Sequence, residues 1–207
     1  MYLQNNFQEI STKRELFKLI QFIVKENYTH HAVNENTSSL FEECYELYKE
    51  EALFFENSIY YVVKSLRGSI VAGIRICKYK EVSLPIEKVF GIDIKKFVTP
   101  KQPIFHIGRF AIHKNCKSLV LLKQLLVLAL APLTKNKQSV AFAECDAKLY
   151  KILRMLGIKV SAIGKPLVYL GSTTIPIIIQ FKDFIRFYKA HKYLINNQEV
   201  ANFKQVI

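Results

Sequence analysis

One stretch, residues 104–130 (IFHIGRFAIHKNCKSLVLLKQLLVLAL), constrains the fold of this chain more than any other. Residues 104–112 are rich in β-branched and aromatic side chains, which is typical of a central strand. A short basic turn, residues 113–118, separates them from an apolar segment that runs to Leu133. The pattern predicts a strand, a turn and a buried helix in direct succession.

The start of that helix is a candidate anion site. The first N–H groups of a helix have no partner within the helix, and the helix dipole favours negative charge there. Asn115 or Ser118 can cap this start, and Pro132 can end the helix. Lys114 and Lys117 lie in the turn itself. Two interpretations stay open: a phosphate-binding turn, or an ordinary strand–helix unit with solvated lysines.

Length and composition favour one compact domain over residues 1–207. Half of the residues are hydrophobic, which excludes a disordered chain. The longest apolar run, residues 119–133, is too short to span a bilayer, and the N-terminus does not have the layout of a signal peptide. The cysteines lack CxxC spacing, which argues against a zinc site and a disulfide scaffold and predicts a cytoplasmic location. These cysteines are Cys44, Cys77, Cys116 and Cys145.

The chain is strongly basic. Thirty Lys and Arg residues against seventeen Asp and Glu residues leave a formal net charge of +13. Such a field attracts nucleic acid, anionic lipid, phosphorylated cofactors or an acidic protein. The lysines are spread along the chain rather than gathered in one tail or helix, which disfavours nucleic acid. Peripheral membrane contact is left open.

The remaining segments predict a mixed α/β fold with a partly antiparallel sheet flanked by helices. Ser11 or Thr12 should cap a first helix, with Glu15 as the reciprocal partner. Residues 27–38 are polar and predict a loop. The other expected helices are 39–54, a short one within 84–98, 147–156 with Gly157 as its C-terminal cap, and 182–195. The other expected strands are 58–66 and 70–80, which form a hairpin, and 140–144, 159–163, 167–170 and 175–181.

Two residues of the hairpin point to special roles. Gly73 lies inside the second strand, which suggests a β-bulge or the close approach of another segment. Arg75 interrupts an apolar run. A charged side chain there lies either on an exposed face or in a pocket with an anionic partner.

Five short motifs occur in one order along residues 58–180. They are a glycine turn before a strand that carries an arginine (68–76, GSIVAGIRI), LPIEKVF (84–90), HIGRFAI (106–112), a helix ending in glycine (150–158, YKILRMLGI), and GKP (164–166) followed by Tyr169 and Gly171. In this order they resemble the GNAT superfamily of acyltransferases. The similar branch contains the homoserine-lactone autoinducer synthases and the long-chain N-acyl amino acid synthases, in which the third motif reads Glu-x-Ser-Arg-Phe-x-Val.

The resemblance implies an N-acyltransferase with a GNAT-type sheet. Such an enzyme moves a medium- or long-chain acyl group from a thioester, on acyl carrier protein or coenzyme A, to a small-molecule amine such as an amino acid, without a metal. His106 is the candidate base because an imidazole titrates near neutrality; a hydrogen-bonded sheet histidine is the alternative. Arg109 should lie on the opposite face of a regular strand, in an ion pair or against a substrate carboxylate.

Other site residues follow from the same resemblance. Glu144 and Asp146 end the next strand, near the expected position of the amine, and Arg75 could contact the substrate. The backbone amides of three residues would hold the pantetheine or the thioester oxygen: Phe110, Ala111 and Ile112. The phosphate groups would meet Lys114, Asn115, Lys117 and Ser118. Tyr150 is expected to pack in the core rather than to act as an acid.

The chain also departs from the family pattern. The usual pyrophosphate loop is rich in glycine, whereas residues 113–118 contain none. A weaker grip on pyrophosphate is expected, so acyl carrier protein is as good a donor candidate as coenzyme A. The N-terminal aspartates of homoserine-lactone synthases are not recognisable, which argues against S-adenosylmethionine as the acceptor. Two other functions stay open: a binding module without catalysis, and a nucleic-acid-binding protein.

Overall fold

The computed structural model describes residues 7–31, 37–116, 118–169 and 172–195. The strands are β1 (Phe7–Glu9), β2 (Ser58–Lys64), β3 (Ile70–Lys78), β4 (Ile104–Ile112), β5 (Val140–Asp146), β6 (Ser161–Ala162), β7 (Leu167–Tyr169) and β8 (Ser172–Gln180). The α-helices are α1 (Lys13–His31), α2 (Thr37–Ala52), α3 (Pro85–Phe90), α4 (Leu119–Leu130), α5 (Ala147–Met155) and α6 (Phe181–His191). Short 3₁₀ helices are η1 (Phe55–Asn57), η2 (Ile94–Phe97), η3 (Pro132–Lys135) and η4 (Lys192–Leu194).

The strands form one sheet in the order β1-β2-β3-β4-β5-β8-β6, and β7 also pairs with β8. Every strand pair that the structure describes is antiparallel except β4–β5, which is parallel. The connection between these two strands contains α4, as parallel neighbours require. The predicted fold class, a mixed and partly antiparallel sheet flanked by helices, is confirmed.

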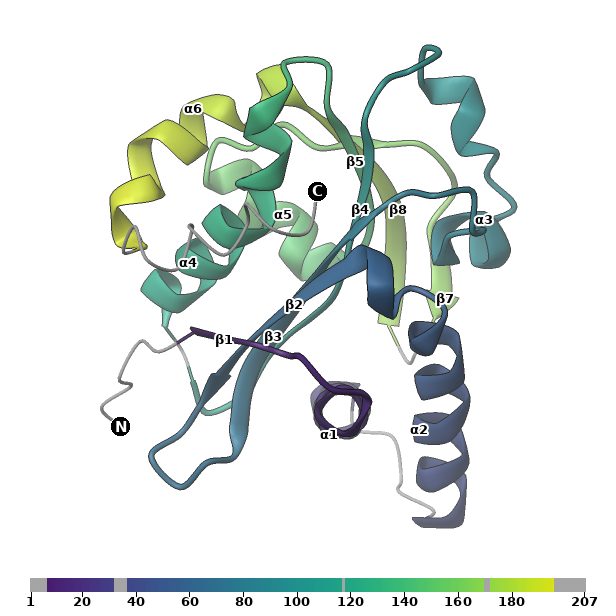
Figure 1. Cartoon of the computed structure of the whole chain (residues 1–207), viewed down its shortest axis with the longest axis vertical. Coiled ribbons are helices and arrows are strands. Elements are labelled where there is room, and N and C mark those ends of the chain that lie inside the picture. Colours follow the sequence, from purple (N-terminus) through teal and green to yellow (C-terminus); the bar gives the residue numbers. More distant parts are fainter. Residues whose placement is uncertain (1–6, 32–36, 117, 170–171, 196–207) are drawn as a thin grey trace.

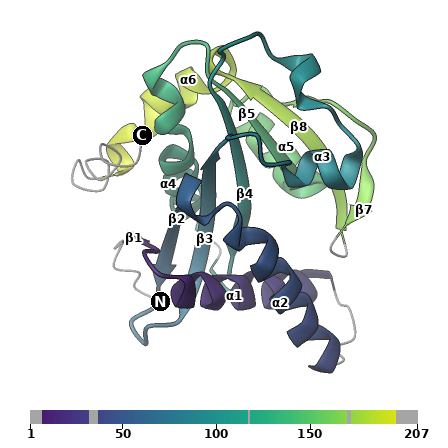
Figure 2. The same cartoon turned by 45° about the vertical axis from the view of Figure 1, so that its right-hand side comes forward.

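Helices cover both faces of the sheet (Figures 1 and 2). On one face α4 and α6 pack against the apolar side chains of β2 to β5, and Leu125 and Phe184 are fully buried there. On the other face α1 and α2 cover β2 and β3, with Leu19 and Ile20 at the centre. A third cluster under α3 includes Leu84 and Phe142. No helix in the described ranges combines the length and apolar character needed to cross a bilayer.

The predicted unit of strand, turn and buried helix over residues 104–130 forms as expected. Ser118 caps α4, and its hydroxyl accepts a hydrogen bond from the Leu121 N–H at 3.1 Å. The helix ends at Leu130, and Pro132 begins η3. The segment 119–133 is therefore a helix of twelve residues followed by one 3₁₀ turn. Because Pro132 has no N–H, it cannot continue the α-helical bonding pattern.

Other local predictions are also confirmed. The Thr12 hydroxyl accepts the Glu15 N–H at 3.2 Å, and the Glu15 carboxylate accepts the Ser11 N–H at 3.2 Å. Gly157 follows α5 with φ of +80°, the left-handed conformation that closes many helices. A β-carbon on Gly73 would lie 2.6 Å from Leu19 Cδ1, so α1 does approach the backbone of β3 closely there.

The predicted loop over residues 27–38 is wrong over its first part. Helix α1 continues to His31, and α2 begins at Thr37, so part of the segment is helical; residues 32–36 lie outside the described residues. The Tyr28 hydroxyl donates to Glu43 of α2 at 2.5 Å. This contact between helices gives the polar end of α1 a partner that its own sequence does not reveal.

The boundaries late in the chain also differ from the predictions. Strand 159–163 shortens to Ser161–Ala162, while the strand predicted at 175–181 begins earlier, at Ser172. The final helix starts at Phe181 and ends at His191, where one 3₁₀ turn follows.

Candidate active site

Strands β4 and β5 separate toward their C-terminal ends. Their pairing begins at Ile104 with Val140 and ends at Ile107 with Ala143. Beyond that point β4 continues to Ile112, where it still pairs with β3, and β5 continues alongside β8. The sheet therefore opens between the two parallel strands, and we call this region the β4–β5 opening. The backbone N–H and C=O groups of β4 and β5 that face this opening are not hydrogen-bonded to each other as they would be in a continuous sheet.

A β-bulge marks the same part of β4. One residue of β3, Ile74, lies opposite two residues of β4, Arg109 and Phe110. Arg109 has φ of +53°, an uncommon conformation for a residue with a side chain. The bulge interrupts the alternation of side chains along the strand. The prediction that Arg109 lies on the face opposite His106 is therefore wrong, because Arg109 reaches the same buried carboxylate as Arg75, which contacts His106.

That carboxylate belongs to Glu51, at the end of α2. It accepts hydrogen bonds from Arg75 Nη1 at 2.8 Å, from Arg109 Nε at 2.7 Å and from the Tyr60 hydroxyl at 3.0 Å. The side chains of Glu51 and Arg75 are fully buried. Burial alone would raise the pKa of Glu51, but the two guanidinium groups outweigh it and hold the pKa below its usual value. Arg109 also donates to Glu50, at 3.3 Å.

His106 connects this cluster to β5. Its Nδ1 contacts Arg75 Nη2, and its Nε2 lies 2.9 and 3.0 Å from the two carboxylate oxygens of Glu144. A guanidinium can only donate, so Nδ1 must accept and the ring proton must sit on Nε2. The geometry therefore assigns a neutral imidazole that donates to Glu144. The side chain is 1% exposed, and both ring nitrogens are engaged.

Glu144 follows Ala143, the last residue of β5 that pairs with β4, and therefore lies at the β4–β5 opening. Its side chain is 11% exposed, whereas Arg75 is fully buried. Burial would raise the pKa of Glu144, but the hydrogen bond from His106 and the charges of Arg109 and Arg75 outweigh burial and hold that pKa below its usual value. The carboxylate is therefore ionised at neutral pH and directed by a hydrogen bond.

The turn before α4 holds a carboxylate of its own. Glu26 of α1 is 4% exposed and accepts the Lys114 N–H at 2.9 Å, and its other oxygen lies 3.7 Å from His113 Nε2. The Asn115 N–H donates to His113 Nδ1 at 3.2 Å. Lys114 and Asn115 were predicted to meet phosphate, and their backbone amides have partners within the chain, as does the capping Ser118 hydroxyl. The side chains of Lys114 and Asn115 are exposed, and Lys117 lies outside the described residues.

Several other candidates have structural partners. Asp146 caps α5, where its carboxylate accepts the Leu149 N–H at 2.6 Å. Burial, together with the charges of Asp146 and Glu144, raises the pKa of the Cys145 thiol to about 12, which disfavours a thiolate nucleophile. Within the described ranges, no group of three His, Cys, Asp or Glu side chains could hold a metal ion.

The sequence analysis did not identify Glu50, Glu51, Tyr60 or Glu26 as site residues. One signal was present: two arginines inside apolar strands need buried acidic partners, and the acidic segment 39–54 contains the pair Glu50-Glu51. Nothing in the sequence shows which carboxylate meets which arginine.

Comparison with protein families decides what kind of protein carries this site. The model of a family described as N-acyl amino acid synthase FeeM matches residues 20–178, a span that includes α2, the bulged strand β4 and the Glu144 strand β5. The chain belongs to the FeeM family. It is therefore an N-acyltransferase, as the resemblance in its motifs implied. No curated protein sequence matches the chain.

Solved structures agree with the fold of this FeeM-family chain. FeeM, an N-acyl amino acid synthase from uncultured soil microbes, is 14% identical and has a TM-score of 0.63, with 93% of this chain and 99% of that chain covered. The acyl-homoserine-lactone synthase LasI is 17% identical, with a TM-score of 0.55 and coverage of 89% and 94%. MesI, a CoA-dependent acyl-homoserine-lactone synthase, is 19% identical, with a TM-score of 0.53 and coverage of 93% and 97%.

Proposed function

We propose that this FeeM-family protein transfers a medium- or long-chain acyl group from an acyl thioester to the amine of an amino acid. We further propose that the reaction takes place in the β4–β5 opening, with Glu144 as the proton acceptor. One observation carries the assignment: an ionised carboxylate lies at this opening, held by a hydrogen bond from His106.

The reaction needs one proton transfer in each direction. The amine nitrogen attacks the thioester carbonyl carbon, whose oxygen becomes an oxyanion while the nitrogen becomes positively charged. Glu144 takes the proton from that nitrogen. The C–S bond then breaks as the carbonyl re-forms, and the thiolate leaves and takes the proton from Glu144. The products are an amide and a thiol, and no acyl-enzyme forms.

His106 acts as a positioning residue in this mechanism rather than as the base. Its Nδ1 lone pair faces Arg75, and its Nε2 proton is directed at Glu144. To act as a base it would have to give up one of these partners inside the buried network. Its hydrogen bond instead fixes the orientation of the Glu144 carboxylate. The same burial keeps Arg75 from touching a substrate, and Asp146 is engaged in its cap.

The amide of Phe110 is our candidate donor to the oxyanion. The His113 N–H donates to Val71 on β3 at 2.8 Å, and successive N–H groups of a strand point to alternate sides. The N–H of Ala111 therefore points toward β3, and we propose that the N–H of Phe110, the neighbouring residue in the bulge, is directed at the β4–β5 opening. A backbone N–H aimed at the developing charge is the usual way to stabilise a tetrahedral adduct.

The turn before α4 favours acyl carrier protein over coenzyme A as the donor. Glu26 places a carboxylate on the Lys114 amide, in the turn that we propose would have to offer free donors to the pyrophosphate of coenzyme A. A carrier protein presents a single phosphate at this end of the pantetheine and contributes its own acidic surface. MesI is described as CoA-dependent, so acyl-CoA is the donor to compare in an assay.

The decisive experiment compares Glu144→Gln, His106→Ala and Glu42→Gln, each with acyl carrier protein and coenzyme A thioesters and a panel of amino acids. Mass spectrometry of the products identifies the donor and the acceptor. We expect Glu144→Gln to lower kcat by about 10²- to 10⁴-fold. Glu42 is exposed on α2, so the same chemical change there should leave kcat unaltered.

His106→Ala separates the two candidate bases. If His106 only positions Glu144, the variant keeps part of its activity, and the acid limb of its pH–rate profile moves to higher pH because the pKa of Glu144 rises without the hydrogen bond. A variant as inactive as Glu144→Gln, with no shifted limb, would make His106 the base. A wild-type protein that binds acyl carrier protein but forms no amide would contradict the proposed reaction.

A further inference from the structure

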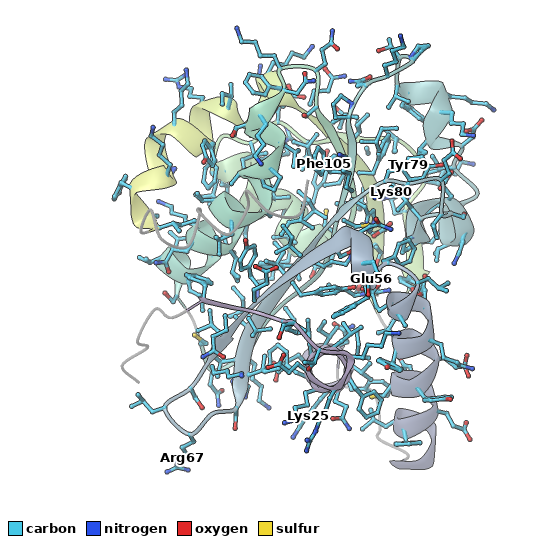
Figure 3. The ribbon with its side chains drawn as sticks, in the orientation of Figure 1. Lys25, Glu56, Arg67, Tyr79, Lys80 and Phe105 are labelled. Carbon is cyan, nitrogen blue, oxygen red and sulfur yellow. The ribbon has the colours of Figure 1, made fainter. Side chains whose placement is uncertain are left out.

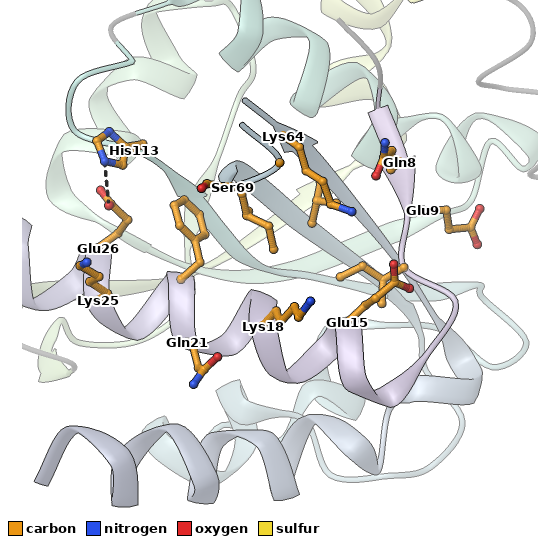
Figure 4. A pocket seen from close by; sticks show the side chains of 15 residues that line it. Gln8, Glu9, Glu15, Lys18, Gln21, Lys25, Glu26, Lys64, Ser69 and His113 are labelled. Atoms are coloured by element: carbon orange, nitrogen blue, oxygen red, sulfur yellow. Dashed lines mark ion pairs between the residues drawn. The ribbon is translucent and has the colours of Figure 1, made fainter. Parts of the chain in front are cut away.

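A cavity lies away from the β4–β5 opening. It has a volume of about 550 Å³ and lies between α1 and the β2–β3 hairpin, with β1 at one side (Figure 4). The hairpin tip that carries Arg67 extends beyond α1 and forms its outer end (Figure 3). Its size is typical of small-molecule sites. Neither His106 nor Glu144 lines it, so the proposed acyl transfer does not use it.

The floor of the cavity is apolar. Ile10 and Val62 are 7% and 2% exposed, and both belong to the apolar cluster that packs against α1. Phe22 of α1 and Ile70 at the start of β3 complete this lining and are half-buried. Such a surface favours a hydrocarbon chain, because covering it removes apolar area from water.

Two lysines enter the cavity from opposite walls. Lys18 extends from α1 and Lys64 from β2, and both side chains lie in the space between the helix and the strands (Figure 4). Lys18 makes no hydrogen bond or ion pair with any residue that the structure describes. Lys64 acts on Glu15 only at a distance, and its charge helps to lower the pKa of that carboxyl. The two ammonium groups are thus available to an anion.

The acidic residues of the cavity are less available. Glu15 accepts hydrogen bonds from Ser11 and Thr12 at the start of α1. Glu26 holds the amide of the turn before α4. Burial raises the pKa of Glu9. The lining contains three lysines and three glutamates, and two of the glutamates, Glu15 and Glu26, are held by hydrogen bonds at the two ends of α1.

We propose that this cavity binds an amphiphile with an anionic head group, placed between Lys18 and Lys64, and a hydrocarbon chain along the apolar floor. A free fatty acid and an N-acyl amino acid share this chemistry. Binding requires no turnover, so the proposal stands or fails independently of the proposed acyl transfer.

Photo-crosslinking locates the ligand on the wild-type chain. Dodecanoate and N-dodecanoylglycine, each with a diazirine in the chain, are irradiated with the protein, and labelled peptides are sequenced by mass spectrometry. We expect labels within residues 7–26 and 62–70, and the better competitor of the two identifies the head group. Labels confined to β4 and β5 would mean that the amphiphile occupies only the β4–β5 opening, and they would overturn the proposal.

Charge reversal tests the head-group contacts. The double variant Lys18→Glu with Lys64→Glu should weaken dodecanoate binding by about tenfold or more, because both charge-assisted contacts become repulsive. Lys13→Glu makes the same change on α1 outside the cavity and should leave binding unaltered. Dodecylammonium should bind the wild type weakly and the double variant more tightly. Equal affinities for dodecanoate and dodecylammonium, or a double variant that binds dodecanoate as the wild type does, would overturn the proposal.

Discussion

Glu51 is the residue on which the buried charges of the site depend. One carboxylate serves two guanidinium groups and the Tyr60 hydroxyl, and no part of its side chain is exposed. Arg75 is also enclosed, and its Nε has no hydrogen-bond partner among the described residues. Among the residues that the structure describes, Glu51 is the carboxylate that Arg75 contacts. Removing that charge would leave both arginines poorly compensated in a low-dielectric interior.

We therefore predict that Glu51→Gln lowers the free energy of unfolding by about 3–5 kcal/mol at neutral pH, as for other broken buried ion pairs. Urea denaturation followed by circular dichroism measures the loss. Glu50→Gln is the matched control, because Glu50 is half-buried and makes one 3.3 Å contact with Arg109. That change should cost about 1 kcal/mol or less. Equal losses for the two variants would contradict the central role of Glu51.

We also predict that the stability difference between the wild type and Glu51→Gln depends on pH. The pKa of Glu51 is lower in the folded chain than its ordinary value of 4.5, so its stabilising contribution is complete above pH 4.5 and is lost as pH falls through the folded pKa. The stability difference between wild type and Glu51→Gln should therefore shrink below pH 4.5. Thermal unfolding between pH 7 and pH 3 measures it, and a difference that stays constant would contradict the prediction.

Among the elements of secondary structure, strand β4 with its bulge contributes most to the assembly of the site. A left-handed backbone at Arg109 costs about 1–2 kcal/mol relative to regular strand conformations. The bulge brings Arg109 to the buried carboxylate beside Arg75. The ion pairs of Arg109 offset the backbone strain. The local irregularity is thus part of how the site is assembled.

The contact between α1 and β3 gives a second test at this scale. In Gly73→Ala the new methyl would lie 2.6 Å from Leu19 Cδ1, which is fully buried and has little room to move. We expect a loss of about 1–3 kcal/mol of unfolding free energy, from strain in a close-packed interior. The same substitution in a Leu19→Ala background should cost less, because the clash is gone. Chemical denaturation of the four proteins measures the coupling, and additive losses would contradict it.

For the whole molecule, the net charge of +13 should increase the rate of association most with a negatively charged acyl donor. We predict that kcat/KM with acyl carrier protein falls several-fold between about 0.05 and 0.3 M salt, because the ions screen attraction to the acidic carrier. An acyl-pantetheine without a phosphate is the matched control and should show little change. Equal salt dependence for both donors would argue against electrostatic steering. The single-domain organisation and the cytoplasmic location stay predictions.

Much of the fold followed from the sequence because the signals are local. The helix caps at Thr12, Ser118 and Gly157 each involve residues within four positions of one another. Alternating apolar patterns mark the strands, and apolar patterns with helical spacing mark the helices. The order of the short motifs resembled the right superfamily and branch. Boundaries failed where another element intervened, as at the end of α1, where Tyr28 meets α2.

Only the tertiary structure decided how the site is built. The contacts of Arg75 with Glu51, of Arg75 with His106 and of His106 with Glu144 join residues 24, 31 and 38 positions apart. The sequence by itself determined that His106 and Glu144 lie on neighbouring segments, and that a buried Arg75 needs an anion. Which carboxylate meets it, which face Arg109 occupies and which nitrogen of His106 carries the proton depend on strand register, on one bulge and on the docking of α2. These are properties of packed elements, because a hydrogen bond forms only where folding brings donor and acceptor within about 3 Å of each other.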